Sequence, residues 1–142
     1  MSAKGIKNIY LVFVGVFFIV LDQLSKLIIK ANHSSLIVEN NGVVWGYITN
    51  PMAKVIITLA GLIILAIIFS QAKLSSIWQT VAIVLVASGV LSNIVDRILY
   101  SSVIDFIHLP NFLSWWPTFN IADIYIFVGI VIYGQQVISH KS

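Results

Sequence analysis

The 142-residue chain is 59% hydrophobic and 9% charged, carries a formal net charge of +3 and contains no cysteine. This composition lies outside the range of soluble domains and indicates an integral membrane protein. The missing cysteine excludes thiol nucleophiles, disulfides and thiolate metal sites. The length leaves room for about four spans of roughly 20 residues, so we expect a single membrane domain over residues 1–142. The basic residues stand singly at segment ends, which favours lipid headgroups over nucleic acid as their partners.

The first span is predicted over residues 9–29. Its apolar character continues through Leu24 and Leu27 with no small-residue cleavage site, so it is not the core of a signal peptide. Asp22 and Lys26 lie four residues apart on one helix face, where each lowers the cost of burying the other's charge. The pair fits either a structural salt bridge or a direct contact with substrate.

A β-hairpin is predicted after this span. Two short apolar runs, residues 36–38 and 43–45, flank Asn40, Asn41 and Gly42, and an Asn-Gly pair supplies the positive φ angles of a tight turn. The asparagines fit a plain turn, or they could offer amide groups to an extended peptide laid beside the hairpin.

Two antiparallel spans follow, over residues 52–69 and 77–95, joined by a short polar loop. The third span contains four small residues that allow close backbone approach, Ala87, Ser88, Gly89 and Ser92. Asn93 and Asp96, three residues apart near its end, place polar groups on one helix face.

The connection from Arg97 to Pro117 is too apolar for a solvated loop, and tryptophans such as Trp116 favour headgroup depth. We expect a surface-lying loop or short amphipathic helix, followed by a fourth span over residues 121–138. The predicted fold is therefore an all-α membrane protein, a four-transmembrane-helix bundle with a small extracytoplasmic β-hairpin or cradle.

Alternating spans place one set of polar residues on one side of the membrane. Its members are Asp22, Lys26, Asn40, Asn93, Asp96, Arg97, Asp105, Asn120 and Asp123. The other side carries lysines and few other polar groups, so the positive-inside rule makes it cytoplasmic, together with both termini.

Clustered carboxylates at an interface suit either cation transport or activation of water. Transporters tend to place the coupling acid near the bilayer midplane, whereas these acids lie at or beyond helix ends, so hydrolysis is preferred. Two close carboxyl groups resist ionising together, which leaves one as an acid and one as a base. Spacing alone does not choose Asp105 over Asp96.

Five ordered motifs resemble the lipoprotein signal peptidase, or signal peptidase II, family over nearly the whole chain. They are Asp22-Gln23-Leu24-Ser25-Lys26; Asn40 with Gly42 and Trp45; residues Gly89 to Arg97; Val103-Ile104-Asp105-Phe106; and Phe119-Asn120-Ile121-Ala122-Asp123. Family members are aspartic proteases of the bacterial cytoplasmic membrane. This chain departs from the usual pattern at Glu39, Val43, Val44, Ser88, Ser92 and Tyr125.

The resemblance implies that Asp105 and Asp123 form the catalytic dyad and that the substrate is a prolipoprotein, cut before a diacylglyceryl-modified cysteine. It also implies inhibition by globomycin and contact with membrane lipids, and we expect a monomer. Eight residues would support or position the dyad: Asp22, Lys26, Asn40, Gly42, Asn93, Asp96, Arg97 and Asn120. The mechanism requires no metal and no cofactor. For Arg97, a clamp on Asp96 or a loop carbonyl is favoured over a headgroup contact. A small transporter and a noncatalytic lipoprotein-binding member of the fold are the competing hypotheses.

Overall fold

The computed structural model describes residues 3–40, 59–63, 65–67, 76–109, 113 and 116–139. The elements are α1 (Ala3–Asn32), the 3-10 turn η1 (Ser34–Leu36), β1 (Val38–Asn40), α3 (Ile77–Tyr100), β2 (Val103–Asp105) and α4 (Ile121–Ser139). Residues 59–63 and 65–67 are also helical, within the expected second span of residues 52–69. The rest of that span lies outside the described residues.

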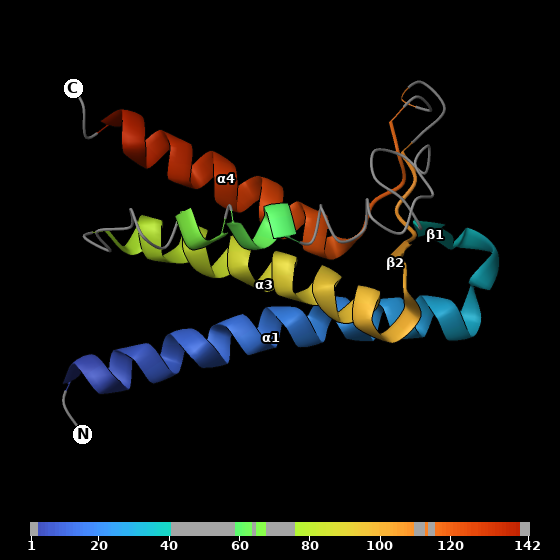
Figure 1. Ribbon diagram of the computed structural model, residues 1–142, viewed down its shortest axis with the longest axis horizontal. Helices are drawn as coiled ribbons and strands as arrows, with labels where there is room; N and C mark the ends of the chain where they lie inside the picture. Colours follow the sequence, from blue (N-terminus) through green and yellow to red (C-terminus); the bar gives the residue numbers. More distant parts are fainter. Residues whose placement is uncertain are drawn as a thin grey trace.

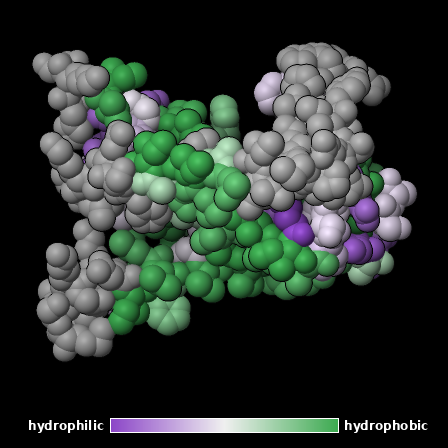
Figure 2. All heavy atoms as spheres, in the orientation of Figure 1, coloured by the Kyte–Doolittle hydropathy of each residue, from purple (hydrophilic) through white to green (hydrophobic). Residues whose placement is uncertain are grey.

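Three helices within the described part of the chain are long and apolar enough to cross a membrane. These segments are Ile9–Asn32, Ile77–Tyr100 and Ile121–Ser139, and they coincide with three of the predicted spans. In Figure 2, apolar side chains cover the middle of the helices, and hydrophilic ones lie toward the two ends, with one group at the end that carries the strands. The chain is therefore a mostly helical membrane protein with a small sheet at one end.

Helix α3 lies at the centre and packs against both α1 and α4 (Figure 1). It begins after Ser76, whose side chain accepts a hydrogen bond from the Trp78 N–H, a common helix N-cap. It ends at Tyr100 because Ser101 takes a left-handed conformation, with φ 57°. The helix extends five residues beyond the predicted end at 95, so Asn93, Asp96 and Arg97 project from its last turns.

Two glycines bring α3 and α4 into direct backbone contact. A Cβ added at Gly89 would lie 2.4 Å from the Ala122 carbonyl oxygen, and one at Gly129 would lie 2.7 Å from the Ala82 carbonyl oxygen. Each helix thus presents a glycine to the backbone of the other. The predicted role of Gly89 in close packing is confirmed, and the contact places the first turn of α4 beside the polar end of α3.

The two strands form an antiparallel pair at the end of the molecule opposite the termini (Figure 1). Val38 pairs with Asp105, and Asn40 pairs with Val103. The first run of the expected hairpin is thus a strand, but its described partner is β2, far away in sequence. The expected return strand at 43–45, and the turn at Gly42, lie outside the described residues.

The connection after Arg97 first completes α3 and is then extended over residues 103–107. After β2 it runs to Ile107, which forms a bridge with Phe119 just before α4. Residues 103–107 are therefore neither a surface helix nor a loose loop, and β2 itself is buried.

Candidate active site

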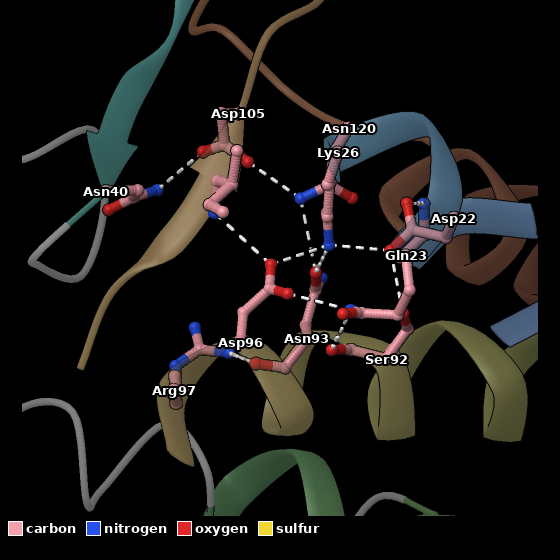
Figure 3. A network of polar contacts seen from close by, with 12 residues as sticks. Asp22, Gln23, Lys26, Asn40, Ser92, Asn93, Asp96, Arg97, Asp105 and Asn120 are labelled. Carbon is pink, nitrogen blue, oxygen red and sulfur yellow. Dashed lines mark hydrogen bonds and ion pairs between the residues drawn. The ribbon is translucent and has the colours of Figure 1, made fainter. Parts of the chain in front are cut away.

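Asp105 ends β2 and is held by two asparagine amides. Its Oδ1 accepts a hydrogen bond from Asn120 Nδ2 at 2.7 Å, and its Oδ2 accepts one from Asn40 Nδ2 at 3.1 Å. Asn40 reaches it because the two strands pair in antiparallel register. Asn40 therefore helps to fix the carboxyl group, in addition to its place at the end of β1 (Figure 3).

Asp123 lies in the first turn of α4 and forms a reciprocal cap with Asn120. The Asp123 N–H donates to Asn120 Oδ1 at 3.0 Å, and the Asn120 N–H donates to Asp123 Oδ2 at 3.1 Å. This arrangement satisfies two free N–H groups of the helix start and places a carboxylate at its positive end. Asn120 consequently contacts both Asp105 and Asp123.

Asn93 supplies the next connection. Its Nδ2 donates to Asp123 Oδ1 at 2.9 Å, while its Oδ1 accepts from Asn120 Nδ2 at 3.2 Å and from Lys26 Nζ at 3.1 Å. The two aspartates are thus joined through two asparagines that come from α3 and from the start of α4.

Both aspartates line one pocket with a volume of about 620 Å³. Asn40 also lines it, and most of its other walls are apolar or aromatic, among them Leu109, Trp116 and Phe127. Phe127 is an exposed residue of α4, one turn beyond Asp123, so the pocket continues onto the membrane-facing side of that helix. A cleft that joins two acids to an apolar surface suits a peptide that arrives from the bilayer.

The surroundings of Asp105 favour its protonated form. Burial, and after it the negative charge of Asp123, raise its pKa to about 7, against the lowering effect of the hydrogen bonds from Asn40 and Asn120 and of the positive charge of Lys26. Desolvation and a like charge both disfavour ionisation of a carboxyl group. Near neutral pH, Asp105 can therefore hold a proton beside Asp123.

A buried ion cluster lies behind this pair. Lys26 Nζ is 2.6 Å from Asp22 Oδ2 and 2.7 Å from Asp96 Oδ2, and all three residues are at most 1% exposed. A buried charge is tolerated only when it is paired and hydrogen-bonded. Asp22 and Lys26 therefore form a structural salt bridge, one of the two interpretations that the sequence allowed.

Arg97 was expected to clamp Asp96 or a loop carbonyl, and its described contact is with a carbonyl of α3 instead. Its Nη1 donates to the backbone carbonyl of Asn93 at 3.1 Å, one turn back on α3. Lys26 takes the place of Arg97 beside Asp96, because Asp96 points toward α1 and the Lys26 side chain reaches it there. Asp96 is thus a buried residue that supports the site, as predicted, and the cation beside it is Lys26.

Gln23 and Ser92 belong to this cluster, although the sequence pattern assigned neither of them to it. Gln23 Nε2 lies 2.7 Å from Asp96 Oδ1 and 3.0 Å from Ser92 Oγ. Ser92 Oγ donates to Asp22 Oδ2 at 2.7 Å. A signal was available for Gln23, which follows Asp22 and precedes Lys26 by three residues and so faces the same neighbouring helix.

The fold and the site define an integral membrane protein with paired carboxyl groups at one end of its helices. A sequence model described as signal peptidase (SPase) II matches residues 14–138. The chain therefore belongs to the signal peptidase II family and is a protease of that family.

Named relatives and solved structures agree with this assignment. The chain is 33% identical to "Lipoprotein signal peptidase" of Staphylococcus aureus strain JH9, over 135 aligned residues that cover 85% of this chain and 83% of the relative, and equally to that of strain Newman. A solved structure described as "Bacterial membrane enzyme structure by the in meso method at 2.3 A resolution" is 28% identical, with a TM-score of 0.75 and coverage of 94% of this chain and 90% of the other. A second, at 1.9 Å, is 29% identical with a TM-score of 0.72, covering 90% and 92%.

Proposed function

We propose that this protein is an aspartic endopeptidase that removes the signal peptide from diacylglyceryl-modified prolipoproteins by cutting before the lipidated cysteine. The observation that carries the proposal is the pocket of about 620 Å³ in which Asp105 and Asp123 both lie. The two acids share a hydrogen-bonding partner, Asn120, and burial together with the charge of Asp123 raises the pKa of Asp105 to about 7. Membership of the signal peptidase II family supports the substrate class.

Water is the nucleophile in the proposed reaction. Asp123, as the carboxylate, takes a proton from water while the water oxygen attacks the carbonyl carbon before the cysteine. Asp105 gives its proton to the carbonyl oxygen, which forms a gem-diol. As the diol collapses, one hydroxyl returns its proton to Asp105, Asp123 protonates the leaving nitrogen, and the C–N bond breaks. Both aspartates regain their starting protonation states.

Binding of the substrate would use the strands and the membrane-facing side of α4. An extended cleavage segment would lie beside β1, with Asn40 near the scissile carbonyl and Asp105 and Asp123 on either side of it. The apolar part of the signal peptide would follow the wall that contains Phe127. The acyl chains would remain in the bilayer, so binding energy remote from the reacting bond orients it.

The proposed arrangement in the membrane is a single domain of four transmembrane helices, with residues 52–69 as the second span. Both termini would be cytoplasmic, in the bacterial inner membrane, and the site would lie at the extracytoplasmic leaflet. The protein would act as a monomer, in contact with membrane lipids. Lys4 and Lys7, at the start of α1 and opposite the site, support this orientation.

Cleavage of a diacylated prolipoprotein by the purified protein in lipid tests the proposal. We expect cleavage before the modified cysteine, inhibited by globomycin, and much slower cleavage of the same peptide without its diacylglyceryl group. Equal turnover of the two peptides would contradict the proposed substrate class. Absence of cleavage in the wild-type protein would favour the competing transporter or lipoprotein-binding hypotheses.

A further inference from the structure

The backbone N–H immediately before each dyad aspartate is bound by a buried carboxylate. The Ala122 N–H, which precedes Asp123, donates to Asp22 Oδ1 at 2.9 Å. The Ile104 N–H, which precedes Asp105, donates to Asp96 Oδ2 at 3.2 Å. The positions of Asp22 and Asp96 are therefore transmitted, through one hydrogen bond each, to the backbone that carries the dyad.

Ser92 and Gln23 in turn hold these two carboxylates. Ser92 Oγ donates to Asp22 Oδ2, the oxygen that Lys26 also contacts, and Gln23 Nε2 donates to Asp96 Oδ1. Gln23 also donates to Ser92 Oγ, so the two neutral side chains connect the carboxylates across the interface between α1 and α3 (Figure 3). Each carboxylate thus has its charge compensated by Lys26 and its orientation fixed by a neutral donor.

We propose that Gln23 and Ser92 are positioning residues for the hydrolysis, which set the relative placement of Asp105 and Asp123 through Asp96 and Asp22. The inference rests on the proposed function of the dyad. It assigns a role in turnover to two residues that touch neither the pocket nor the reacting atoms.

A carboxylate that lost its neutral side-chain donor would keep Lys26 and one backbone N–H as partners and would lose an orientational constraint. A lysine ammonium is a compact charge on a flexible stem, whereas an amide or hydroxyl donor points in one direction. Loss of the neutral donor therefore leaves the ion cluster in place and lets the attached N–H, and the aspartate after it, move. Small misplacements of reacting groups have large effects on rate.

Ser92→Ala and Gln23→Met remove the two donors with little change of side-chain size. Ser88→Ala is the matched control, because Ser88 lies one turn earlier on α3, is equally buried, and bonds only to the backbone carbonyls of Gly15 and Val84. Each variant is assayed with a diacylated prolipoprotein peptide for kcat, KM and pH profile, per mole of folded protein.

We expect Ser92→Ala and Gln23→Met each to lower kcat about tenfold with KM within about twofold, since the groove itself is unchanged. We also expect the alkaline limb of the pH profile to move to lower pH. The charged groups that act on Asp105 are Asp123 of α4, Lys26 of α1 and Arg97 of α3, and a greater separation from Asp123 weakens the repulsion that favours its protonated form. Ser88→Ala should change neither kcat nor the limb.

A kcat and a pH limb in both variants equal to those of Ser88→Ala would overturn the proposal, even if their melting temperatures fall. If Gln23→Met yields no folded protein, Ser92→Ala alone decides the matter, since it removes a single oxygen atom. If the wild-type protein itself does not cleave the substrate, that result contradicts the proposed function of Asp105 and Asp123, and it is distinguishable from a failure of the positioning proposal.

Discussion

Neutral asparagine side chains make the direct side-chain contacts with the dyad carboxyl groups. Asn40 and Asn120 donate to Asp105, and Asn93 donates to Asp123. Lys26 bonds to Asp22 and Asp96 instead. A cation in contact with a carboxylate would strongly favour its ionised form, so the use of amides lets one of the two acids keep a proton near neutral pH.

Replacement of either dyad aspartate by asparagine should abolish cleavage and leave the protein folded. The amide has nearly the same shape but exchanges no proton at the required step, so we expect turnover to fall by at least about 100-fold. Asp105→Asn and Asp123→Asn would be assayed together with thermal melting in lipid. Wild-type turnover in either folded variant would remove that residue from the dyad.

The raised pKa of Asp105 predicts a pH dependence of cleavage. Because Asp105 must be protonated to donate to the carbonyl oxygen, kcat/KM should fall above pH about 7, tenfold per pH unit at the limit. Activity falls as the pH rises because burial keeps Asp105 protonated up to about pH 7, and the proton is lost above that pH. A profile that continues to rise beyond pH 8 would show that the proton comes from another group.

The same electrostatic coupling can be measured without catalysis. Asp123→Asn removes the negative charge that helps to raise the pKa of Asp105, so that pKa should fall from about 7 while burial keeps it above the ordinary value of 3.8. Infrared titration of the protein labelled at aspartate carbons would follow it. An unchanged Asp105 titration would mean that the two carboxyl groups lie too far apart to act together.

Several site residues could be predicted from the sequence because charged residues are rare in this chain. The chain has only five acids, and those within apolar runs are costly unless they are used. The same argument could not connect Gln23 or Ser92 to the acids, because neutral residues of these types are common at helix contacts. It allowed Asp96 as a partner of Arg97, with a loop carbonyl as the alternative. Whether Asp96 meets Arg97 or Lys26 depends on how α1 rotates against α3, which no local pattern specifies.

At the scale of elements, the contact between α3 and α4 fixes the start of α4. Gly89 lies directly against the Ala122 carbonyl, one residue before Asp123. A side chain at this point must push the two backbones apart, because the nearest atom is the main-chain carbonyl oxygen of Ala122, which cannot rotate away as a side chain could. The helix packing and the site are therefore mechanically coupled.

Gly89→Ala should destabilise the protein and reduce cleavage. Overpacking of this kind costs about 1–3 kcal/mol of unfolding free energy, and displacement of Ala122 would carry Asp123 with it. Gly134→Ala is the control, because a Cβ there meets no atom within 4 Å. Gly134→Ala should melt at or slightly above the wild-type temperature. Equal melting temperatures for the two variants would contradict the close contact.

The elements differ in how far the sequence specified them. Long apolar runs define α1, α3 and α4 through the length needed to cross a bilayer. The strands are three residues each, and β1 pairs with β2 across 65 positions of sequence, as the contact of Asn40 with Asp105 shows. A turn signal such as Asn41-Gly42 describes only local geometry, so this long-range pairing was not predicted.

At the scale of the whole molecule, the polar groups gather at one end of an otherwise apolar bundle. The ends of α1 and α3 and the start of α4 meet at the strands, while the start of α1 and the end of α4 lie at the opposite end (Figure 1). The sequence predicted that these polar groups lie on one side, because successive membrane spans run in opposite directions. Which end faces the cytoplasm depends on a lysine bias that Lys30 and Arg97 weaken, so sidedness needs its own experiment.

The absence of cysteine makes that experiment direct, because a single introduced thiol is the only label site. Ser35→Cys lies in η1 beside the strands and Ser139→Cys at the far end of α4, and both serines are exposed. With a membrane-impermeant maleimide added to intact spheroplasts, Ser35→Cys should react at once and Ser139→Cys only after permeabilisation. The positive-inside bias gives this direction, since Lys4 and Lys7 precede the first span. Both variants must first be shown to cleave substrate. The reverse labelling pattern would place Asp105 and Asp123 at the cytoplasmic leaflet, where the proposed approach of an exported prolipoprotein would be impossible.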